Sequence, residues 1–486
     1  MHTDVLNHSS LINEETDKDF RIERDFLGEK EISNQNLYGV QTTRALDNFQ
    51  ITGLPISNEP YMIKALGLVK MAAARANMDC GVLPENIGNA IIEASRRVVS
   101  GAVNDQFPTD LIQGGAGTSV NMNANEVIAN LALEQLGFEK GDYQHCDPNN
   151  HVNCSQSTND VYPSAFRIAL LLRMETYQRE LSQLAQSFVK KGEEFKDVLK
   201  MGRTQLQDAV PMSLGDEFKG WAHTIEEEIT RLDESKKLIQ EINMGATAIG
   251  TKVNAPDGYP ELVCDYLAQF SGLPLRLSEN LIEATSDTGA YVQLSGVLKR
   301  SAVKVSKICN DLRLLSSGPR TGLNEINLPQ LQPGSSIMPG KVNPVIPEVV
   351  NQTAYYVIGA DVTVTMASEA GQLQLNVMEP VIAFSLFTSM QWMTNACQTL
   401  RMKCIDGITA NAAHTQEMVM NSIGIVTLLN PMLGYQTCAG IAKEALATKK
   451  TIHQLVVEDK KLLNQAEWDQ LFSSENLIRP KYFKKH

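Results

Sequence analysis

A short stretch in the last third of the chain has the residue types needed to bind and transform a small anion. Residues 334–344 read GSSIMPGKVNP, with two glycines, two prolines, two adjacent serines, one lysine and one asparagine. Proline and glycine at this density exclude a helix interior or a central strand, so the stretch is expected to be a loop. Backbone N–H groups near Gly334 and Gly340, the charge of Lys341 and the amide of Asn343 would suit a carboxylate. The alternative is a structural turn with solvated serines, and these residues alone do not decide between the two.

Two other stretches gather hydrogen-bonding groups ahead of expected helices. Residues 114–123 read GGAGTSVNMN and lead into a helix expected over 123–136, and residues 153–160 read NCSQSTND and precede a long helix. An anion can bind at a helix N-terminus, because the first N–H groups have no partner within the helix. The simpler interpretations are a tight turn and an ordinary helix cap, since Ser, Thr, Asn and Asp all cap helices.

Long amphipathic helices are the elements that must position these stretches. From about residue 164 to 199, apolar residues recur at steps of four and three, as in a helix with one buried seam. Similar seams run over 214–232 and 291–312, and two more helices are expected near 346–370 and 380–403. A helix of about 30 residues is about 45 Å long. The pattern therefore predicts a mainly α fold with a central bundle of long helices.

Changes in this pattern divide the chain into four parts. Residues 1–20 are polar and are expected to form a flexible extension. We assign 21–155 to an N-terminal domain, 156–405 to the central helical-bundle domain and 406–486 to a small C-terminal helical domain. The N-terminus lacks the apolar segment of a secretion signal, and no run of about 20 apolar residues could cross a membrane. We therefore expect a cytoplasmic protein with no membrane partner.

Composition restricts the partners and cofactors. The chain has 486 residues and a net charge of −13, which argues against nucleic acid as its main partner. Its eight cysteines include no C-x-x-C pair and its eight histidines no H-E-x-x-H motif, so no protein-built metal site is expected. A phosphate-binding P-loop is excluded, because Gly334 and Gly340 are one residue too far apart and Val342 follows Lys341.

Taken together, these motifs resemble the aspartase/fumarase superfamily, whose loop GSSxMPxKxNP is present at 334–344. The other shared motifs are GGAGTSVNMN, QSTND, GRTQLQDA and GATAIGT, at residues 114–123, 156–160, 202–209 and 245–251. The resemblance extends from about residue 21 to about residue 480 and implies the three-domain fold of that superfamily. It also implies a homotetramer in which each active site is shared between three subunits.

Within the superfamily, the chain is more similar to the aspartases than to the fumarases. GRTQLQDA, GATAIGT and GQLQLNVMEPV (residues 371–381) are typical of aspartases. Fumarases usually have a histidine at the position of Gln205, beside a glutamate that corresponds to Glu348. Glutamine does not titrate, so a His–Glu proton relay is absent, although some aspartases also have a histidine there. The resemblance implies reversible deamination of L-aspartate to fumarate and ammonium by anti elimination. The alternatives are a class II fumarase-type hydratase and a catalytically silent helical assembly protein.

The resemblance also assigns roles to residues. Removal of the proton beside the β-carboxylate gives an aci-carboxylate intermediate, which donors already in place must stabilise. Ser335 corresponds to the catalytic base of the family, and backbone N–H donors and Lys341 are expected to make its hydroxyl a stronger acid. The residues implied for the β-carboxylate are Thr118, Ser157, Thr158 and Ser336. Those implied for the α-carboxylate are Thr204, Lys341 and Asn343. Those implied for the amino group are Asn159, Thr118 and Gln205. No cofactor is required; some aspartases are activated by Mg²⁺, and no residues of this sequence are assigned to bind the ion.

Overall fold

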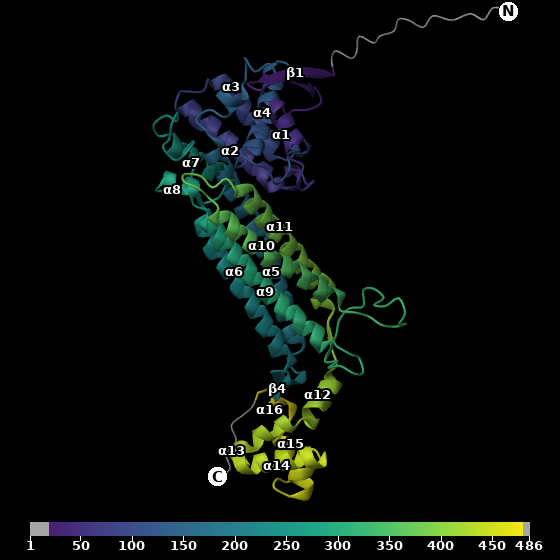
Figure 1. Ribbon diagram of the computed structural model, residues 1–486. Helices are drawn as coiled ribbons and strands as arrows, with labels where there is room; N and C mark the ends of the chain where they lie inside the picture. Colours follow the sequence, from purple (N-terminus) through teal and green to yellow (C-terminus); the bar gives the residue numbers. More distant parts are fainter. Residues whose placement is uncertain (1–18, 480–486) are drawn as a thin grey trace, which may run out of the picture. The chain divides into compact units, whose positions relative to one another are not determined.

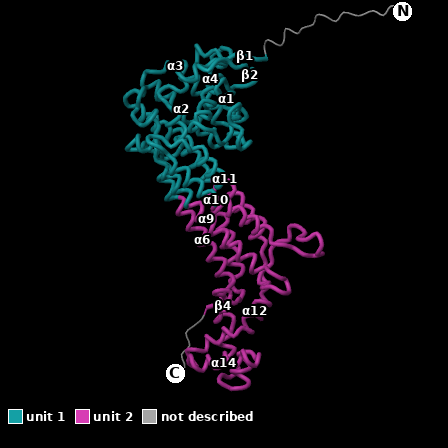
Figure 2. Tube along the Cα trace, viewed as in Figure 1, with its two compact units in different colours: residues 1–175, 233–296, 359–390 teal, residues 176–232, 297–358, 391–486 magenta. Residues whose placement is uncertain are grey.

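The computed structural model describes residues 19–479 (Figure 1). Most of the extension expected over residues 1–20 therefore lies outside the described residues. Contacts divide the chain into two compact units (Figure 2). Unit 1 contains the described residues within 1–175, 233–296 and 359–390, and unit 2 contains those within 176–232, 297–358 and 391–486. The three-domain division with boundaries after residues 155 and 405 stays a prediction.

The fold is mainly α, as the apolar seams predicted. The long helices are α5 (Thr158–Glu194), α6 (Leu214–Ile239), α9 (Gly289–Leu315), α10 (Val345–Glu369) and α11 (Glu379–Lys403). Each of them has one part in unit 1 and another part in unit 2. The strands of the described residues pair only in two-stranded sheets, so helix packing supplies most of the core.

Unit 1 begins with a hairpin of β1 (Phe20–Asp25) and β2 (Gly28–Ser33). Its other helices and strands are α1 (Val40–Asn48), α2 (Pro60–Asp79), α3 (Glu85–Val99), α4 (Thr118–Leu136), β5 (Glu241–Ile242), α7 (Tyr259–Ser271), β6 (Arg276–Leu277) and α8 (Leu281–Ser286). Its short helices are η2 (Ile56–Asn58), η3 (Asn104–Gln106) and η4 (Pro148–Val152). The bundle helices meet here at Phe166, whose ring lies 4.6 Å from that of Tyr291 and 5.3 Å from that of Phe387.

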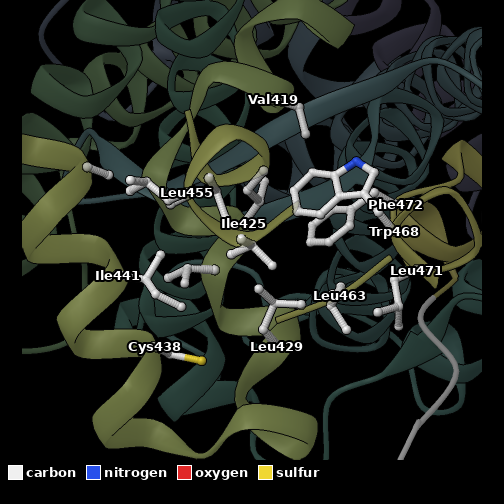
Figure 3. Close-up of a cluster of buried hydrophobic side chains, with 14 of the residues drawn as sticks. Val419, Ile425, Leu429, Cys438, Ile441, Leu455, Leu463, Trp468, Leu471 and Phe472 are labelled. Carbon is white, nitrogen blue, oxygen red and sulfur yellow. The ribbon is translucent and has the colours of Figure 1, made fainter. Parts of the chain in front are cut away.

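Unit 2 contains the hairpin of β3 (Leu199–Thr204) and β4 (Gln207–Ser213) and the pair β7 (Ile326–Asn327) and β8 (Thr409–Ala410). Its shorter helices are η5 (Ile405–Gly407), α12 (Ala412–Asn421), η6 (Ile423–Leu429), α13 (Asn430–Leu433), α14 (Tyr435–Thr448), η7 (Gln454–Asp459), α15 (Gln465–Leu471) and α16 (Ser474–Ile478). The C-terminal helices enclose an apolar cluster of their own, in which the rings of Trp468 and Phe472 stack 3.8 Å apart (Figure 3). Leu199 and Met201 of β3 belong to the same cluster, so the β3–β4 hairpin is packed onto these helices.

No helix within residues 19–479 is both long enough and apolar enough to cross a membrane.

Glu379, the first residue of α11, is a carboxyl group buried in unit 1. Burial raises its pKa to about 8, and the charge of Arg167 opposes this shift only in part. The stability associated with such a group is fully present below its ordinary pKa and is lost as the pH rises through about 8. Glu379→Gln is therefore expected to reduce the loss of unfolding free energy between pH 5 and pH 9 by on the order of 3 kcal/mol, measured by urea denaturation. Glu369→Gln, at an exposed position, is the control; an unchanged pH dependence in Glu379→Gln would contradict the effect of burial.

Candidate functional site

In unit 1, three polar stretches meet at the N-terminus of α5. The hydroxyl of Thr158, the first residue of α5, accepts a hydrogen bond from Nδ2 of Asn121 at 3.2 Å. Asn121 lies in the first turn of α4, which begins at Thr118. The side chain of Asn159 donates from Nδ2 to the carbonyl of Ala248 at 2.8 Å. The structure thus brings together the three motifs around residues 114–123, 156–160 and 245–251.

A proline in α5 explains part of this arrangement. Pro163 has no N–H, so the carbonyl of Asn159, four residues earlier, lacks its usual helical partner. That carbonyl instead accepts a hydrogen bond from Nδ2 of Asn243 at 3.0 Å. The segment that precedes residues 245–251 is therefore tied to the first turn of α5.

Two buried charged residues support these loops. Nζ of Lys70 donates to Oδ1 of Asn153 at 3.0 Å and to Oε1 of Gln156 at 2.9 Å. The carboxylate of Asp160 accepts from the backbone N–H groups of Ser157, Gly245 and Thr247. Burial lowers the pKa of Lys70 to about 7 and raises the pKa of Asp160 to about 7, while the attraction between the two groups opposes both shifts. Together they hold the backbone that carries the predicted substrate-binding residues.

Our sequence analysis did not single out Lys70, although a signal was available. Helix α2 is buried on almost every side, and Lys70 lies within its apolar stretch GLVKMAAA. A lysine that cannot reach water from such a position needs buried polar partners. A lysine within an otherwise apolar stretch of a buried helix therefore predicts a polar network next to that stretch.

In unit 2, Thr204 and Gln205 lie at the tip of the β3–β4 hairpin. Pairing of Thr204 with Gln207 leaves Gln205 and Leu206 as a two-residue turn. Their φ angles are 54° and 62°, the left-handed values that a type I′ turn requires at both positions. The side chains of Thr204 and Gln205 are exposed in the isolated chain. A cavity of about 290 Å³ lies beside the turn and is lined in part by Gln205 and Leu206.

Residues 334–344 form the loop expected from the sequence. Its base is closed by two hydrogen bonds, from the N–H of Gly334 to the carbonyl of Lys341 at 2.7 Å and from Nδ2 of Asn343 to the carbonyl of Gly334 at 2.8 Å. One N–H of the Asn343 amide is thus used within the loop, which leaves the other for a substrate oxygen. The side chains of Ser336 and Lys341 are exposed.

The hydroxyl of Ser335 lies inside this loop. Its Oγ accepts hydrogen bonds from the backbone N–H groups of Ile337 at 3.2 Å and of Met338 at 3.0 Å. Donors aimed at an oxygen favour its negatively charged form. The backbone donors that the sequence led us to expect near Ser335 are therefore present, and they suit a serine that acts as an alkoxide base.

Within one chain, the predicted site residues fall into three groups. Unit 1 holds Thr118 with residues 157–159, while unit 2 holds the hairpin tip at 204–205 and the loop at 335–343. Among the described residues of unit 2, no hydrogen bond joins the side chains at the hairpin tip to those of the loop. The assignment of all three groups to a single active site stays a prediction.

Among residues 19–479, no group of three or more His, Cys, Asp or Glu side chains is arranged to hold a metal ion.

Comparisons with known proteins agree with the motifs. A family model described as "Lyase" matches residues 28–359, and one described as "Fumarase C C-terminus" matches residues 425–479. The chain is 54% identical over 466 residues to the aspartate ammonia-lyase of Helicobacter pylori, covering 96% of this chain and 99% of the relative. It is 56% identical over 462 residues to the aspartate ammonia-lyase of Pseudomonas aeruginosa, covering 95% of this chain and 97% of the relative.

Solved structures show the same relationship. The fumarate lyase:delta crystallin from Brucella melitensis, in a crystal structure with bound cobalt, has a TM-score of 0.91 and 50% identity, covering 94% of this chain and 99% of that one. The class II fumarase from Schistosoma mansoni has a TM-score of 0.88 and 32% identity, covering 95% of this chain and 100% of that one. Identity to this fumarase is thus lower than identity to the two aspartate ammonia-lyases.

Proposed function

This chain belongs to the aspartase/fumarase superfamily of lyases, and we propose that it is an aspartate ammonia-lyase, which converts L-aspartate reversibly to fumarate and ammonium. The observation that carries the proposal is Ser335, whose hydroxyl is held by two backbone N–H donors in a loop that also contains Lys341. Relatives that are 54–56% identical over nearly the whole chain are named aspartate ammonia-lyase, which supports the choice of substrate.

The proposed reaction begins with Ser335 as an alkoxide. Its Oγ takes the proton from the carbon beside the β-carboxylate, and the C–H electron pair moves into that carboxylate to give the aci-carboxylate. This intermediate collapses to the double bond of fumarate as the C–N bond breaks, and nitrogen leaves with its electron pair as ammonia. Because the amino group departs from an ammonium, no side chain has to protonate it. Ser335 then returns its proton to water, and ammonia takes up one proton in solution.

Electrostatic stabilisation of the intermediate is the main task of the other residues. We propose that Thr118, Ser157, Thr158 and Ser336 donate to the β-carboxylate, where the negative charge develops. Thr158 is the first residue of α5, so the positive end of that helix dipole acts at the same place. The α-carboxylate is held by Thr204, Lys341 and Asn343, and the amino group is oriented by Asn159, Thr118 and Gln205.

A fumarase-type hydratase is the second candidate, since a class II fumarase has the same fold. Gln205 argues against it, because a glutamine cannot relay a proton to or from water. Purified protein is given L-aspartate in one cuvette and L-malate in another, and fumarate is followed by its ultraviolet absorbance. Signal from aspartate alone supports the proposal, and signal from malate alone overturns it. A folded protein silent with both would favour a catalytically silent assembly protein.

Lys341→Ala is expected to raise KM for L-aspartate about tenfold to a hundredfold, because a charged hydrogen bond to the α-carboxylate is lost in both the ground state and the transition state. The value of kcat is expected to change much less. Steady-state kinetics on Lys341→Ala and on Lys190→Ala, which removes an exposed lysine from α5, distinguish a local effect from a loss of overall charge. An unchanged KM in Lys341→Ala would remove this residue from the site.

We further propose a homotetramer whose active sites are each built from three subunits. Helix α10 supports the assembly, because its exposed face has Tyr355, Gly359, Val362 and Met366 at steps of four, three and four. Tyr355, Val362 and Met366 are each more than half exposed in the isolated chain, an apolar seam suited to another long helix. The presence of three separate groups of site residues in one chain supports the shared sites.

Mixed tetramers test the sharing. Light scattering on a sizing column measures the mass, and co-expression of Ser335→Ala with Thr158→Val chains measures the sharing. If one site takes Ser335 and Thr158 from different subunits, some sites in the mixture contain neither change, and activity returns although each variant alone is inactive. A tetramer without recovered activity would contradict sharing between these two residues.

We also propose that no cofactor is required, that Mg²⁺ acts only as an activator and that the protein is cytoplasmic. Side chains supply every group in the reaction above, and no step is assigned to the ion. All eight cysteines are free thiols, which suits a reducing compartment. Dialysis against EDTA followed by addition of Mg²⁺ tests the second point, and fractionation of the source cells tests the third.

A further inference from the structure

A buried carboxylate, Glu325, holds the end of strand β3. Its side chain is 1% exposed, and its Oε1 accepts a hydrogen bond from Nη1 of Arg203 at 2.5 Å. Its Oε2 lies 3.0 Å from Nζ of Lys200, which also donates to Oε2 of Glu217 on α6 at 2.6 Å. Both basic residues are in β3, and Arg203 directly precedes Thr204. Because a buried charge that loses its partner is strongly destabilising, these contacts restrain the end of the strand.

Glu325 is itself fixed to the rest of unit 2. Its N–H donates to the carbonyl of Leu315 at the end of α9, and its carbonyl accepts from the N–H of Asn411, both at 2.9 Å. The next residue, Ile326, pairs with Ala410 in the β7–β8 sheet. Glu325 therefore has a position set by α9 and β8, and it does not depend on the hairpin for its own placement.

The end of the hairpin is turned relative to its base. The pairing register shifts by one residue between Met201 and Arg203, where Ala209 and Val210 together oppose Gly202. A Cβ at position 202 would lie 2.9 Å from the carbonyl of Val210, so the shift requires glycine there. Such a bulge increases the local twist and redirects the side chains beyond it. The packing of Leu199 and Met201 on the C-terminal cluster thus holds the base but does not by itself set the direction of residues 203–208.

Neither the backbone conformation nor the packing of the turn at Gln205 and Leu206 stabilises it strongly. Gln205 and Leu206 both have left-handed φ angles, which residues other than glycine and asparagine rarely adopt. The cavity of about 290 Å³ beside them also means that close packing does not fix the turn from that side. On the other strand, Asp208, which pairs with Arg203, accepts a hydrogen bond from Oγ of Ser422 at 2.7 Å. Polar contacts therefore restrain both strands just before the turn.

We propose that Glu325 is a positioning residue, which directs the Thr204–Gln205 turn toward substrate through Arg203, while Ser422 holds Asp208 on the paired strand. The inference deepens the proposed function and rests on it, since Thr204 and Gln205 are there assigned to the α-carboxylate and the amino group. Glu325 does not touch substrate in this scheme, and its effect is on where the two substrate-binding side chains lie.

The test uses Glu325→Gln in the full-length protein, because glutamine keeps the shape of the side chain and removes its charge. KM for L-aspartate is expected to rise about tenfold, with kcat within threefold of the wild type. This is the pattern expected when binding of the substrate and of the transition state is weakened equally. Amide hydrogen exchange is expected to become faster over residues 203–208 and to stay unchanged over 199–201. Glu217→Gln is the matched control: it removes the other partner of Lys200 and leaves Arg203 paired, so KM should stay within twofold of the wild type.

Arg203→Met and the double variant show whether Glu325 acts through Arg203. If it does, the double variant has the same KM as the stronger single variant, whereas a multiplied effect overturns the inference. Should Glu325→Gln fail to fold, Ser422→Ala tests the other contact, with a rise in KM of about threefold and faster exchange around residue 208. Wild-type KM and exchange in folded Glu325→Gln, or a reduced active fraction with an unchanged KM, would also overturn it.

Hydrogen exchange separates this inference from the proposed function. If the wild type forms no fumarate from L-aspartate, the proposed function fails, but exchange over residues 203–208 still shows whether Glu325 restrains the turn. If the wild type is active and exchange in Glu325→Gln is unchanged, the positioning role alone fails.

Discussion

Ser335→Ala is expected to lower kcat for L-aspartate by about a thousandfold or more, because the group that removes the proton is lost. The substitution deletes one oxygen from an exposed loop, whose base is closed by bonds to Gly334, Lys341 and Asn343 and not by this hydroxyl. The fold and the binding of substrate should therefore persist. Calorimetric titration with succinate, a dicarboxylate that cannot eliminate ammonia, should give a Kd within a few-fold of the wild type.

Ser336→Ala provides the matched control for this prediction. Ser336 is the adjacent residue, is exposed where Ser335 is half-buried, and is assigned only a hydrogen bond to the β-carboxylate. Its loss should slow the reaction about tenfold to a hundredfold, because a donor to the developing charge is removed while the base remains. Near-normal kcat in folded Ser335→Ala, or equal losses in the two variants, would rule out Ser335 as the base.

The helical fold could be predicted because its signal is local and repeated. The apolar seam predicted a helix from about residue 164 to 199, and this helix is α5. The observed helix starts earlier, at Thr158, and also ends earlier, at Glu194. The early start has a physical reason. The polar residues were interpreted as a cap ahead of the helix, but they continue into its first turn. The carbonyl of Asn159 in that turn accepts a hydrogen bond from the side chain of Asn243, which belongs to another segment. Such a partner, 84 positions away, has no signature in the local sequence.

The site could be predicted only as separate motifs. The loop at 334–344 could be predicted, because its prolines fix φ and its glycines allow turns that exclude a helix or strand, and the donors to Ser335 are N–H groups of that same loop. Lys70 and Glu325 were not predicted, because their roles depend on burial and on partners distant in sequence. Three-dimensional contacts show how each group of site residues is held, while the joining of the groups across subunits remains the proposal made above.

A single glycine next to Thr118 controls the approach of α4 to α5. Gly117 caps α4 with a φ of 91°, and a Cβ at this position would lie 2.1 Å from Cδ2 of Tyr162. Tyr162 is fully enclosed in the first turns of α5, so its ring cannot move aside without disturbing the helix that carries Thr158. Both the backbone conformation and the close contact therefore require glycine.

Gly117→Ala is expected to lower the free energy of unfolding by about 3–5 kcal/mol, since overpacking adds to the strain of a left-handed alanine. It should also weaken substrate binding, because α4 must move away from α5 and Thr118 moves with it. Urea denaturation and KM for L-aspartate measure the two effects. Gly137→Ala separates their causes: Gly137 caps the other end of α4 with a φ of 84°, but nothing lies within 4 Å of its Cβ position. That variant should lose only about 1 kcal/mol and keep its KM.

The contribution of the ring is measured by making Gly117→Ala in a Tyr162→Ala background. With the ring gone, the close contact disappears, and the substitution should cost about 1 kcal/mol, as at Gly137. An equal cost in both backgrounds would show that the backbone angle alone demands glycine. A cost for Gly117→Ala no larger than that for Gly137→Ala would contradict the close packing of α4 on α5, and with it the arrangement that places the first turn of α4 beside Thr158.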